Sequence, residues 1–290
     1  MKGFIIYNPS FYSDAVKSQT AALKEEFAEL KAEVSVLSGD AFLTGVGDGK
    51  AFTTLENADF IVYLSKDVLT AKILEKSGYK LFNSPSAIEI CDDKAFTYSV
   101  LEENGVPIMD TLFAPRRYFG EDGEDYIKKV EEKFGYPVVV KLCVGSLGKE
   151  VFIATEKNDL LSIKKEIGDK PHLYQKRYGE SGRDLRVIVI GGKAVASMER
   201  VNENDFRSNV ELGGKGYKHI LSEKEKSVAE SAAAAVKADY CGVDLLTENG
   251  EVKVCEVNSN AFFKEISKVS CENIAKIYAK YIFERVKASK

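Results

Sequence analysis

The sequence predicts an α/β (α+β) chain in three parts: a small parallel α/β domain over residues 1–90, a central α+β lobe over 91–174, and an antiparallel-sheet lobe over 175–290. Three observations predict this division. Short apolar runs alternate with helix-like segments in the first 90 residues, a pattern typical of a parallel sheet. Two strand-like runs then flank a glycine-rich loop. Hairpin patterns with Gly-Gly and Asn-Gly turns follow this loop.

The first part begins with compact apolar runs that predict buried strands. These runs are Gly3–Tyr7, Glu33–Leu37, Asp59–Leu64 and Lys80–Phe82. Between them, helical spacing covers Ser13–Leu30, where Ser13 is the expected N-cap, and Asp67–Lys76, which Gly78 closes. The alternation indicates a small parallel sheet with its helices packed on it.

The remaining elements follow from turn residues and apolar periodicity. After the last of these strands we expect a short helix over 85–91, and in the central part helices over 93–104 and 125–134, a loop over 114–123, and strands over 136–143 and 150–154. In the last part we expect a hairpin of Leu185–Ile190 with Lys193–Arg200, a helix over 222–237, a second hairpin of Gly242–Leu246 with Val252–Val257, and a terminal helix over 271–288.

Composition limits the possible partners. Lys and Arg number 41 against 45 Asp and Glu, a net charge of −4, which argues against a general nucleic-acid binder. The five cysteines form no CxxC pair, as expected for reduced cytoplasmic thiols, and two histidines are too few for a typical zinc site or a His-based triad. The apolar run Phe4–Tyr7 is too short for a signal peptide or a membrane span. We therefore expect a cytoplasmic protein without a membrane or nucleic-acid partner.

The second hairpin carries Asp244 on one strand, and Glu256 and Asn258 on the other. Side chains on a strand alternate, so Glu256 and Asn258 share a face. A three-residue loop, Asn249 to Glu251, places Asp244 directly opposite Glu256. A two-residue loop would instead send the two acids to opposite faces.

Two opposed carboxylates lie about 5 Å apart and repel each other unless a cation sits between them. Two carboxylates and an amide form an all-oxygen ligand set that suits Mg²⁺, with Mn²⁺ as an alternative. An ordinary edge hairpin with solvated acids would also explain single acids. The apolar neighbours of Asp244 and Glu256 favour the metal site.

Several cations could hold an anionic ligand near this hairpin. Lys141 ends a run of three valines and precedes the short glycine loop Gly145–Gly148, whose backbone N–H groups could approach phosphate oxygens. Taken alone, the loop equally fits a plain hairpin turn, and Lys94 equally fits a surface lysine. Arg186, Arg200 and Arg207 could each form a surface ion pair, or together they could clamp a polyphosphate.

The ordered motifs resemble those of the RimK-like branch of the ATP-grasp carboxylate–amine ligases over about residues 80 to 285. They are Asn83–Ile88 with Asp93-Lys94, Val139–Lys141 with Gly145–Gly148, Gln175–Tyr178, Asp184–Arg186, Glu199-Arg200, Asp205–Asn209, Gly242–Asp244 and Glu256–Asn258. The resemblance implies an ATP-grasp fold, with the glycine loop as the lid of the central lobe.

The resemblance also implies a role for each matched residue. Lys94, Lys141 and Arg186 belong to the cations around the nucleotide phosphates, and Gly145, Ser146 and Gly148 to the lid. Gln175, Lys176 and Arg177 lie on the strand whose backbone reads adenine, and Asp184 binds the ribose. Arg207, Ser208 and Asn209 lie along the nucleotide, Arg200 is the catalytic arginine, and Asp244, Glu256 and Asn258 hold the metal.

The implied activity is ATP-dependent amide formation through an acyl phosphate, joining glutamate or another amino acid to a carboxylate on a small molecule, protein or peptide. The alternatives are a ligase of the same fold acting on a peptide, an amino-group carrier or a cofactor, a non-catalytic ATP-binding module, and a kinase that stops at a phosphorylated product. Related enzymes often form dimers or tetramers, so a homo-oligomer is one expected state. The family's small residue and proline after the last metal ligand are replaced here by Ser259–Phe263, expected near the acceptor site.

Overall fold

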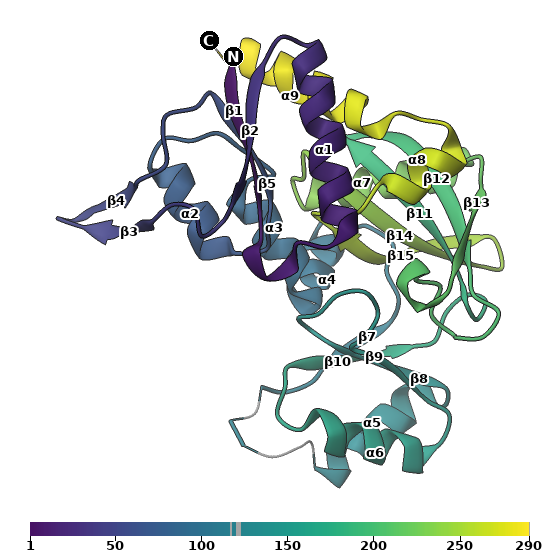
Figure 1. Ribbon diagram of the computed structural model, residues 1–290. Coiled ribbons are helices and arrows are strands. Elements are labelled where there is room, and N and C mark those ends of the chain that lie inside the picture. The colour runs from purple at the N-terminus through teal and green to yellow at the C-terminus, as the bar shows by residue number, and fades with distance from the viewer. Residues whose placement is uncertain (117, 120–122, 290) are drawn as a thin grey trace.

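The N-terminal sheet of the computed structural model is parallel, with strand order β2-β1-β5-β6 (Figure 1). The structure describes residues 1–116, 118–119 and 123–289. The strands are β1 (Lys2–Tyr7), β2 (Glu33–Ser38), β5 (Phe60–Leu64) and β6 (Leu81–Phe82), with the short helix η1 (Pro9–Phe11) and the helices α1 (Asp14–Glu29) and α2 (Val68–Lys76). Ser13 and Asp67 cap the two longer helices. The predicted strands and helices of this part are confirmed within one residue or two.

One element of this part was not predicted. The hairpin of β3 (Thr44–Gly47) and β4 (Lys50–Thr53) projects from the molecule beside α2 (Figure 1). The two strands pair with each other, through registers such as Val46 with Ala51, and form a sheet of their own. Its short strands carry glycines and few apolar residues, so no periodic signal marks them.

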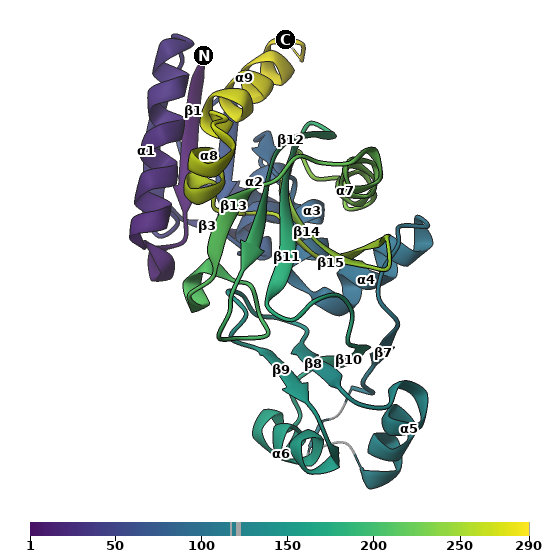
Figure 2. The ribbon, with the colours of Figure 1, turned by 90° about the vertical axis from the view of Figure 1, so that its right-hand side faces the viewer.

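The central sheet has strand order β7-β10-β8-β9 and lies below the rest of the molecule in both views (Figures 1 and 2). Its elements are β7 (Thr111–Phe113), α5 (Glu124–Phe134), β8 (Val138–Leu142), β9 (Val151–Ala154), α6 (Lys157–Ile167) and β10 (His172–Lys176). The helix α6 was not predicted. Part of the expected 114–123 loop, residues 117 and 120–122, lies outside the described residues.

The C-terminal sheet is antiparallel, with strand order β13-β12-β11-β14-β15. Its elements are β11 (Arg183–Ile190), β12 (Lys193–Val201), η2 (Val210–Leu212), β13 (Lys215–Lys218), α7 (Glu223–Ala235), β14 (Tyr240–Glu248), β15 (Glu251–Asn258), α8 (Lys264–Ser270) and α9 (Ile274–Lys287). Both predicted hairpins are present. The helices α3 (Pro85–Asp92) and α4 (Lys94–Glu103) share a core with this sheet.

The predicted terminal helix was wrong at its start. Residues 264–270 form the separate helix α8, and Cys271 ends it with a left-handed backbone at φ 65°. The Asn273 side chain then accepts a hydrogen bond from the Lys276 N–H at 3.0 Å and caps α9. The prediction began the terminal helix at Cys271, three residues before α9 begins, and did not include α8, because apolar periodicity does not show where the backbone turns left-handed.

The acidic hairpin differs from its predicted geometry and still opposes the two acids. Its loop has two residues, because Glu248 pairs with Glu251 across Asn249-Gly250. The ladder continues regularly to Leu245 with Val254, where a β-bulge leaves Cys255 without a partner and pairs Asp244 with Glu256. The predicted three-residue loop was wrong, and the bulge supplies the one-residue shift that the loop does not.

The N-terminal and C-terminal sheets share one core, whereas the central sheet has its own. Ile5 and Phe60 of the parallel sheet pack in one cluster with Ile282 of α9. Val130 of α5 and Leu160 of α6 belong to a cluster made of the central part alone. Among the described residues, no helix combines the length and apolar character needed to cross a membrane.

Candidate active site

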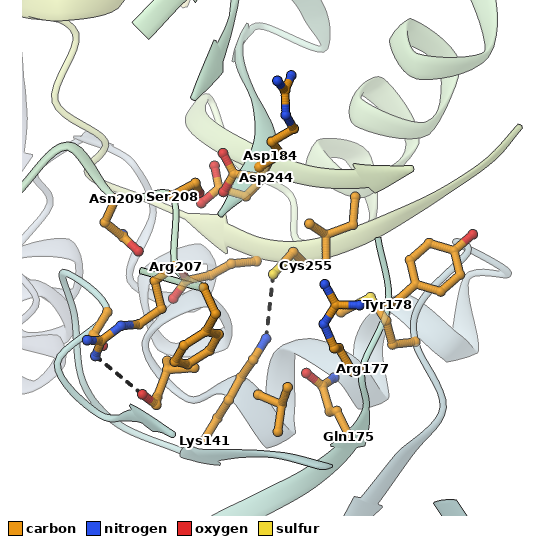
Figure 3. A pocket seen from close by; sticks show the side chains of 18 of the residues that line it. Lys141, Gln175, Arg177, Tyr178, Asp184, Arg207, Ser208, Asn209, Asp244 and Cys255 are labelled. Atoms are coloured by element: carbon orange, nitrogen blue, oxygen red, sulfur yellow. Dashed lines mark hydrogen bonds between the residues drawn. The ribbon is translucent and has the colours of Figure 1, made fainter. Parts of the chain in front are cut away.

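A cleft lies between the central and C-terminal sheets, and most of the predicted site residues line it (Figure 3). Those that line it are Lys94, Lys141, Ser146, Gly148, Gln175, Lys176, Arg177, Asp184, Arg200, Arg207, Ser208, Asn209, Asp244 and Glu256. Gly145, Arg186 and Asn258 were predicted with them and are not among the residues lining the cleft. These residues come from distant parts of the chain, so the fold has assembled one site.

The end of the cleft near Tyr178 is mostly apolar. Met109, Leu246 and Cys255 pack there with Tyr178, Val139 also lines the cleft, and the sequence motifs singled out none of these four as site residues. Isolated apolar residues on buried strands look like ordinary core, which explains the omission. A flat heteroaromatic ring suits such a slot because its faces are apolar.

The hinge beside this slot is β10 and the residues after it. Gln175 is buried and donates a side-chain hydrogen bond to Thr111 Oγ1 at 2.9 Å. The Lys176 side chain is exposed, and its backbone N–H already donates to Asp110 O at 3.2 Å. That N–H is therefore engaged within the protein, and the predicted reading of adenine by this backbone stays a prediction.

Lys94 is buried at the first turn of α4, with only 8% of its surface exposed. Its Nζ donates to Gly145 O at 3.2 Å and forms an ion pair with Glu256 Oε1 at 3.3 Å. Lys94 therefore joins the glycine loop to the acidic hairpin, and the alternative of a surface lysine was wrong. Burial raises the pKa of Glu256, but Lys94 and other cations outweigh it and hold that pKa below its usual value.

Lys141 is buried on β8, and its Nζ lies 3.5 Å from the Sγ of Cys255 (Figure 3). It also lies over the ring of Tyr98, 5.9 Å from the centroid. Burial opposes the charge of Lys141, yet its neighbours Cys255, Tyr98 and Glu256 leave the pKa of Lys141 above the usual value. Burial raises the pKa of the Cys255 thiol despite Lys141, so this thiol stays protonated at neutral pH.

Acids and arginines alternate across one face of the C-terminal sheet. Arg200 donates Nε to Asp184 Oδ1 at 2.7 Å and Nη2 to Asp184 Oδ2 at 2.5 Å, and its Nη2 lies 2.9 Å from Asp244 Oδ2. Arg186 binds the same Asp244 through Nε, and through Nη2 at 2.8 Å. Both carboxylate oxygens of Asp184 accept hydrogen bonds from Arg200, so Asp184 orients that arginine. Its predicted contact with ribose stays a prediction.

Burial governs this network. Arg200 and Asp244 are each 3% exposed. Burial raises the pKa of the Asp244 carboxyl, but Arg186 and Arg200 outweigh it and lower the pKa below its usual value. Burial likewise opposes the charge of Arg200, whose pKa is held well above its usual value by Asp184 and Asp244. Arg200 and Asp244 are therefore both charged at neutral pH, and a surface ion pair does not describe Arg200.

The glycine loop is held against the segment 205–209. The guanidinium of Arg207 is paired with Asp205 at 2.7 Å and donates to Gly148 O, also at 2.7 Å. Gly148 has φ +73°, and a Cβ there would lie 2.7 Å from Asn209 Oδ1. Only glycine combines this backbone conformation with so close an approach. The loop can therefore cover the cleft beside Ser208 and Asn209.

The predicted metal ligands fit a divalent cation by their donor set. Asp244 lies opposite Glu256, and Gly242 lies opposite Asn258, which puts both acids and the amide on one face. The Nδ2 of Asn258 is buried and has no hydrogen-bond partner among the described residues, and its Oδ1 is the atom that would bind a cation. The described part of the chain holds no group of three or more His, Cys, Asp or Glu side chains suited to a metal. Here the acids are balanced by Lys94 and the two arginines, and the metal site stays a prediction.

A family model described as a RimK-like ATP-grasp domain matches residues 91–282. The chain belongs to the RimK-like ATP-grasp family. The matched range contains every predicted site residue, from Lys94 to Asn258. Sequence motifs had indicated this family, and the fold agrees with it.

Among curated proteins, this RimK-like chain is 37% identical over 244 residues to the human N-acetylaspartylglutamate synthase A, covering 80% of the chain and 61% of that protein. It is 38% identical to the mouse β-citrylglutamate synthase B, covering 76% and 57%. A probable α-L-glutamate ligase of Legionella pneumophila is 34% identical, with 78% and 74% covered. The chain spans about three-fifths of the length of the first two.

Solved structures show the same fold. The ATP-grasp ligase PsnB, complexed with a minimal precursor, Mg and ADP, superposes with a TM-score of 0.73 at 16% identity, covering 98% of this RimK-like chain and 97% of PsnB. The D-alanine–D-alanine ligase of Bacillus anthracis complexed with ATP also gives 0.73, at 17% identity, with 100% and 98% covered. At such identities the agreement concerns the fold.

Proposed function

We propose that this protein is an ATP-dependent ligase that joins an amino acid, glutamate first among the candidates, to a carboxylate through an acyl phosphate. The observation that carries the proposal is the order of contacts in the cleft. Lys141 contacts Cys255 of the apolar slot, Lys94 contacts Glu256, and Arg200 contacts Asp244. This order matches the base, phosphates and reacting end of a nucleotide. The names of the curated relatives, which are glutamate-joining synthases and ligases, support the amide chemistry.

The chemistry divides among the chain's own residues. Lys94 and Lys141 offset phosphate charge, and Arg200 offsets the charge that develops on the transferred phosphoryl group. The glycine loop, held by Arg207, excludes water that would hydrolyse the acyl phosphate. An amine then displaces phosphate and forms the amide. Positioning and charge neutralisation supply the catalysis, because phosphoryl transfer needs little covalent help from the protein.

Asp244, Glu256 and Asn258 would hold a divalent cation, Mg²⁺ in the first place and Mn²⁺ as an alternative. Such an ion would neutralise phosphate charge when bound. The carboxylate substrate is a small molecule, or a residue on a protein or peptide. N-acetylaspartate and citrate are the small-molecule candidates that the relatives' names suggest. We place the enzyme in the cytoplasm, where its unpaired cysteines would stay reduced.

The test is ADP release by the purified protein with ATP, Mg²⁺, L-glutamate and either N-acetylaspartate or citrate, with mass spectrometry of the product. We expect ADP and an amide product in equal amounts. The matched variants are Asp244→Asn, which should lower turnover at least a hundredfold, and the exposed Glu284→Gln on α9, which should leave it unchanged. Full turnover by Asp244→Asn would contradict the assignment of this hairpin.

The alternatives give different products in the same assay. A kinase would release ADP with the acid alone and accumulate a stable phosphorylated product. A non-catalytic nucleotide-binding module would bind MgADP in calorimetry without turnover over a broad panel of acids and amines. The buried charge of Arg200, which has no evident use in a passive nucleotide site, favours the ligase.

A further inference from the structure

The position of Arg186 separates it from the nucleotide-binding residues. It was predicted with them, but it is not among the residues lining the cleft. Along β14 the cleft reaches Leu246 and Asp244, and Gly242 lies beyond. A Cβ on Gly242 would lie 3.2 Å from Arg186 Cδ, so the stem of Arg186 crosses the strand at this far position. Arg186 therefore approaches Asp244 from the side away from the apolar slot.

The far side of Asp244 leads to the junction with the N-terminal sheet. The same Cβ on Gly242 would lie 2.6 Å from the Cβ of Ala261, which places Arg186 beside the segment after β15. In that segment Asn260 donates to Leu64 O at 2.9 Å, at the carboxyl end of β5. Ligands of open α/β sheets bind outside the carboxyl ends of the strands. Arg186 thus lies between the acidic hairpin and the carboxyl end of the parallel sheet.

The guanidinium of Arg186 has an unused edge. Asp244 takes Nε and one hydrogen of Nη2. The Nη1 of Arg186 takes part in no hydrogen bond found among the described residues, and it is not one of their buried unpartnered atoms. A guanidinium has five N–H donors, so the edge formed by Nη1 and Nη2 can bind a second carboxylate in bidentate form. The side chain is 12% exposed, which leaves this edge open to a ligand.

The geometry of phosphoryl transfer indicates from which side the acid substrate approaches. The attacking and leaving oxygens lie roughly in line through the transferred phosphoryl group. In the proposed function the nucleotide, as the leaving side, occupies the cleft that Asp244 and Glu256 line. The attacking carboxylate must then come from the opposite side, where Arg186 presents its free edge. We propose that Arg186 is the catalytic residue that binds the acid substrate's carboxylate, and that it does not bind the nucleotide.

This inference rests on the proposed ligase activity. It makes Arg186 a recognition residue for an anionic acid, with its Asp244 pair holding the guanidinium in place. A role limited to neutralising Asp244 would need only a positive charge. A lysine at position 186 distinguishes the two roles. Its ammonium can neutralise Asp244, but it cannot bind two carboxylates through separate planar edges as a guanidinium can.

The experiment compares Arg186→Lys and Arg186→Gln with the wild type and with Arg285→Gln, an exposed arginine of α9 that serves as the matched control. Calorimetry with MgADP gives the nucleotide Kd, and initial ADP release at saturating ATP and L-glutamate gives KM and kcat for citrate or N-acetylaspartate. Far-UV circular dichroism and thermal unfolding establish that each variant is folded. If Arg186→Gln fails to fold, Arg186→Lys, which keeps the charge, carries the test.

We expect both Arg186 variants to raise the KM for the acid at least tenfold, with a Kd for MgADP within threefold of the wild type. Arg285→Gln should leave both values unchanged. The assignment is overturned if lysine restores the KM to within twofold, or if the nucleotide Kd rises in parallel with KM. Wild-type protein without acid-dependent turnover would refute the ligase function itself, and the Arg186 assignment with it, whereas an active wild type with an unchanged KM in the variants refutes only the latter.

Discussion

Asp244 shows how a buried charge can be kept in this cleft. A carboxylate that is 3% exposed would cost several kcal/mol if it were alone. Two arginines from neighbouring strands and an opposed glutamate that is itself paired with Lys94 surround it. Removing any one partner leaves an uncompensated charge, so each member of this network affects the others and double-mutant cycles are required to separate them.

The identity of the charged residues could be predicted from sequence, but their pairing could not. Lys94, Arg200 and Asp244 stand in recognisable motifs, and they do meet in the cleft. That Asp184 would engage Arg200 follows from strand registers, which motifs do not specify. Cys255 was passed over because a thiol between Val254 and Glu256 reads as an inward core residue. The bulge lets the adjacent residues Cys255 and Glu256 both line the cleft, which strict alternation along a strand would not predict.

Cys255 should differ from Cys271 in its reactivity toward alkylating reagents. Its thiol lies in the cleft and has a raised pKa, whereas Cys271 is exposed at the end of α8. With iodoacetamide at pH 7.5 we expect Cys271 to react first and Cys255 slowly, because the thiolate is the reacting form. Saturating MgADP should slow Cys255 labelling at least tenfold and leave Cys271 unaffected, as measured by mass spectrometry of peptides. Equal labelling with and without nucleotide would argue against nucleotide beside Cys255.

At the scale of elements, local signals predicted most helices. Ser13 and Asp67 each accept a hydrogen bond from a backbone N–H at the expected start of a helix. Ser84 does the same just before Pro85, the residue predicted to open its helix. The elements that were missed carry weaker signals. The helix α6 starts at Glu156 without a side-chain cap bond, and α8 likewise lacks one at Phe263. Packing against the sheets decides such elements, and sequence windows do not contain that information.

The helix α7 gives a prediction with a pH sign. Ser222 and Glu225 form a capping box, and His219 adds a contact to Glu225 at 3.1 Å. Burial raises the pKa of Glu225, but the bonds from Ser222 and His219 outweigh it and lower that pKa. The charged Glu225 carboxylate therefore stabilises the folded protein above the usual pKa of glutamate. This stabilisation is lost as the pH falls through the lower pKa that Glu225 has in the folded state.

Ser222→Ala should cost about 1 kcal/mol at pH 7, the typical value of an N-cap. Glu225→Gln should also destabilise at pH 7, and its difference from the wild type should shrink below pH 4. Urea unfolding followed by circular dichroism at several pH values measures both effects. Glu223→Gln, in the same helical turn, is the control. A deficit of Glu225→Gln that stays constant down to pH 3 would show that its charge does not contribute.

At the scale of the molecule, α9 joins the first and last parts of the chain. It packs with α1 and with the parallel sheet, while its neighbour α8 lies on β12 and β13. This arrangement could not be predicted from sequence, because periodicity shows that a helix has an apolar face and does not show which sheet covers it. The central sheet, by contrast, packs one face on its own helices, and Leu173 of β10 joins only a small cluster with Tyr98 and Met109.

Two separate cores predict two levels of stability. We expect the central part, residues 111–176, to exchange its amide hydrogens through an opening of lower free energy than the shared core of the other two sheets. Ile282→Ala on α9 should destabilise the shared core by about 2 to 5 kcal/mol, and Val130→Ala on α5 should accelerate exchange in the central part alone. Hydrogen-exchange mass spectrometry separates the two responses. Uniform acceleration by Val130→Ala would show one cooperative unit.

The bulge at Cys255 also determines whether an oxygen or a sulfur atom faces Asp244. Without it, the regular ladder from the Asn249-Gly250 turn would put the Cys255 sulfur where the Glu256 carboxylate now stands. A pair of hard oxygen donors would become a mixed oxygen–sulfur pair, and soft thiolate ligands prefer zinc or copper to magnesium. One unpaired backbone residue thus separates a site for an abundant hard ion from one open to scarce soft ions.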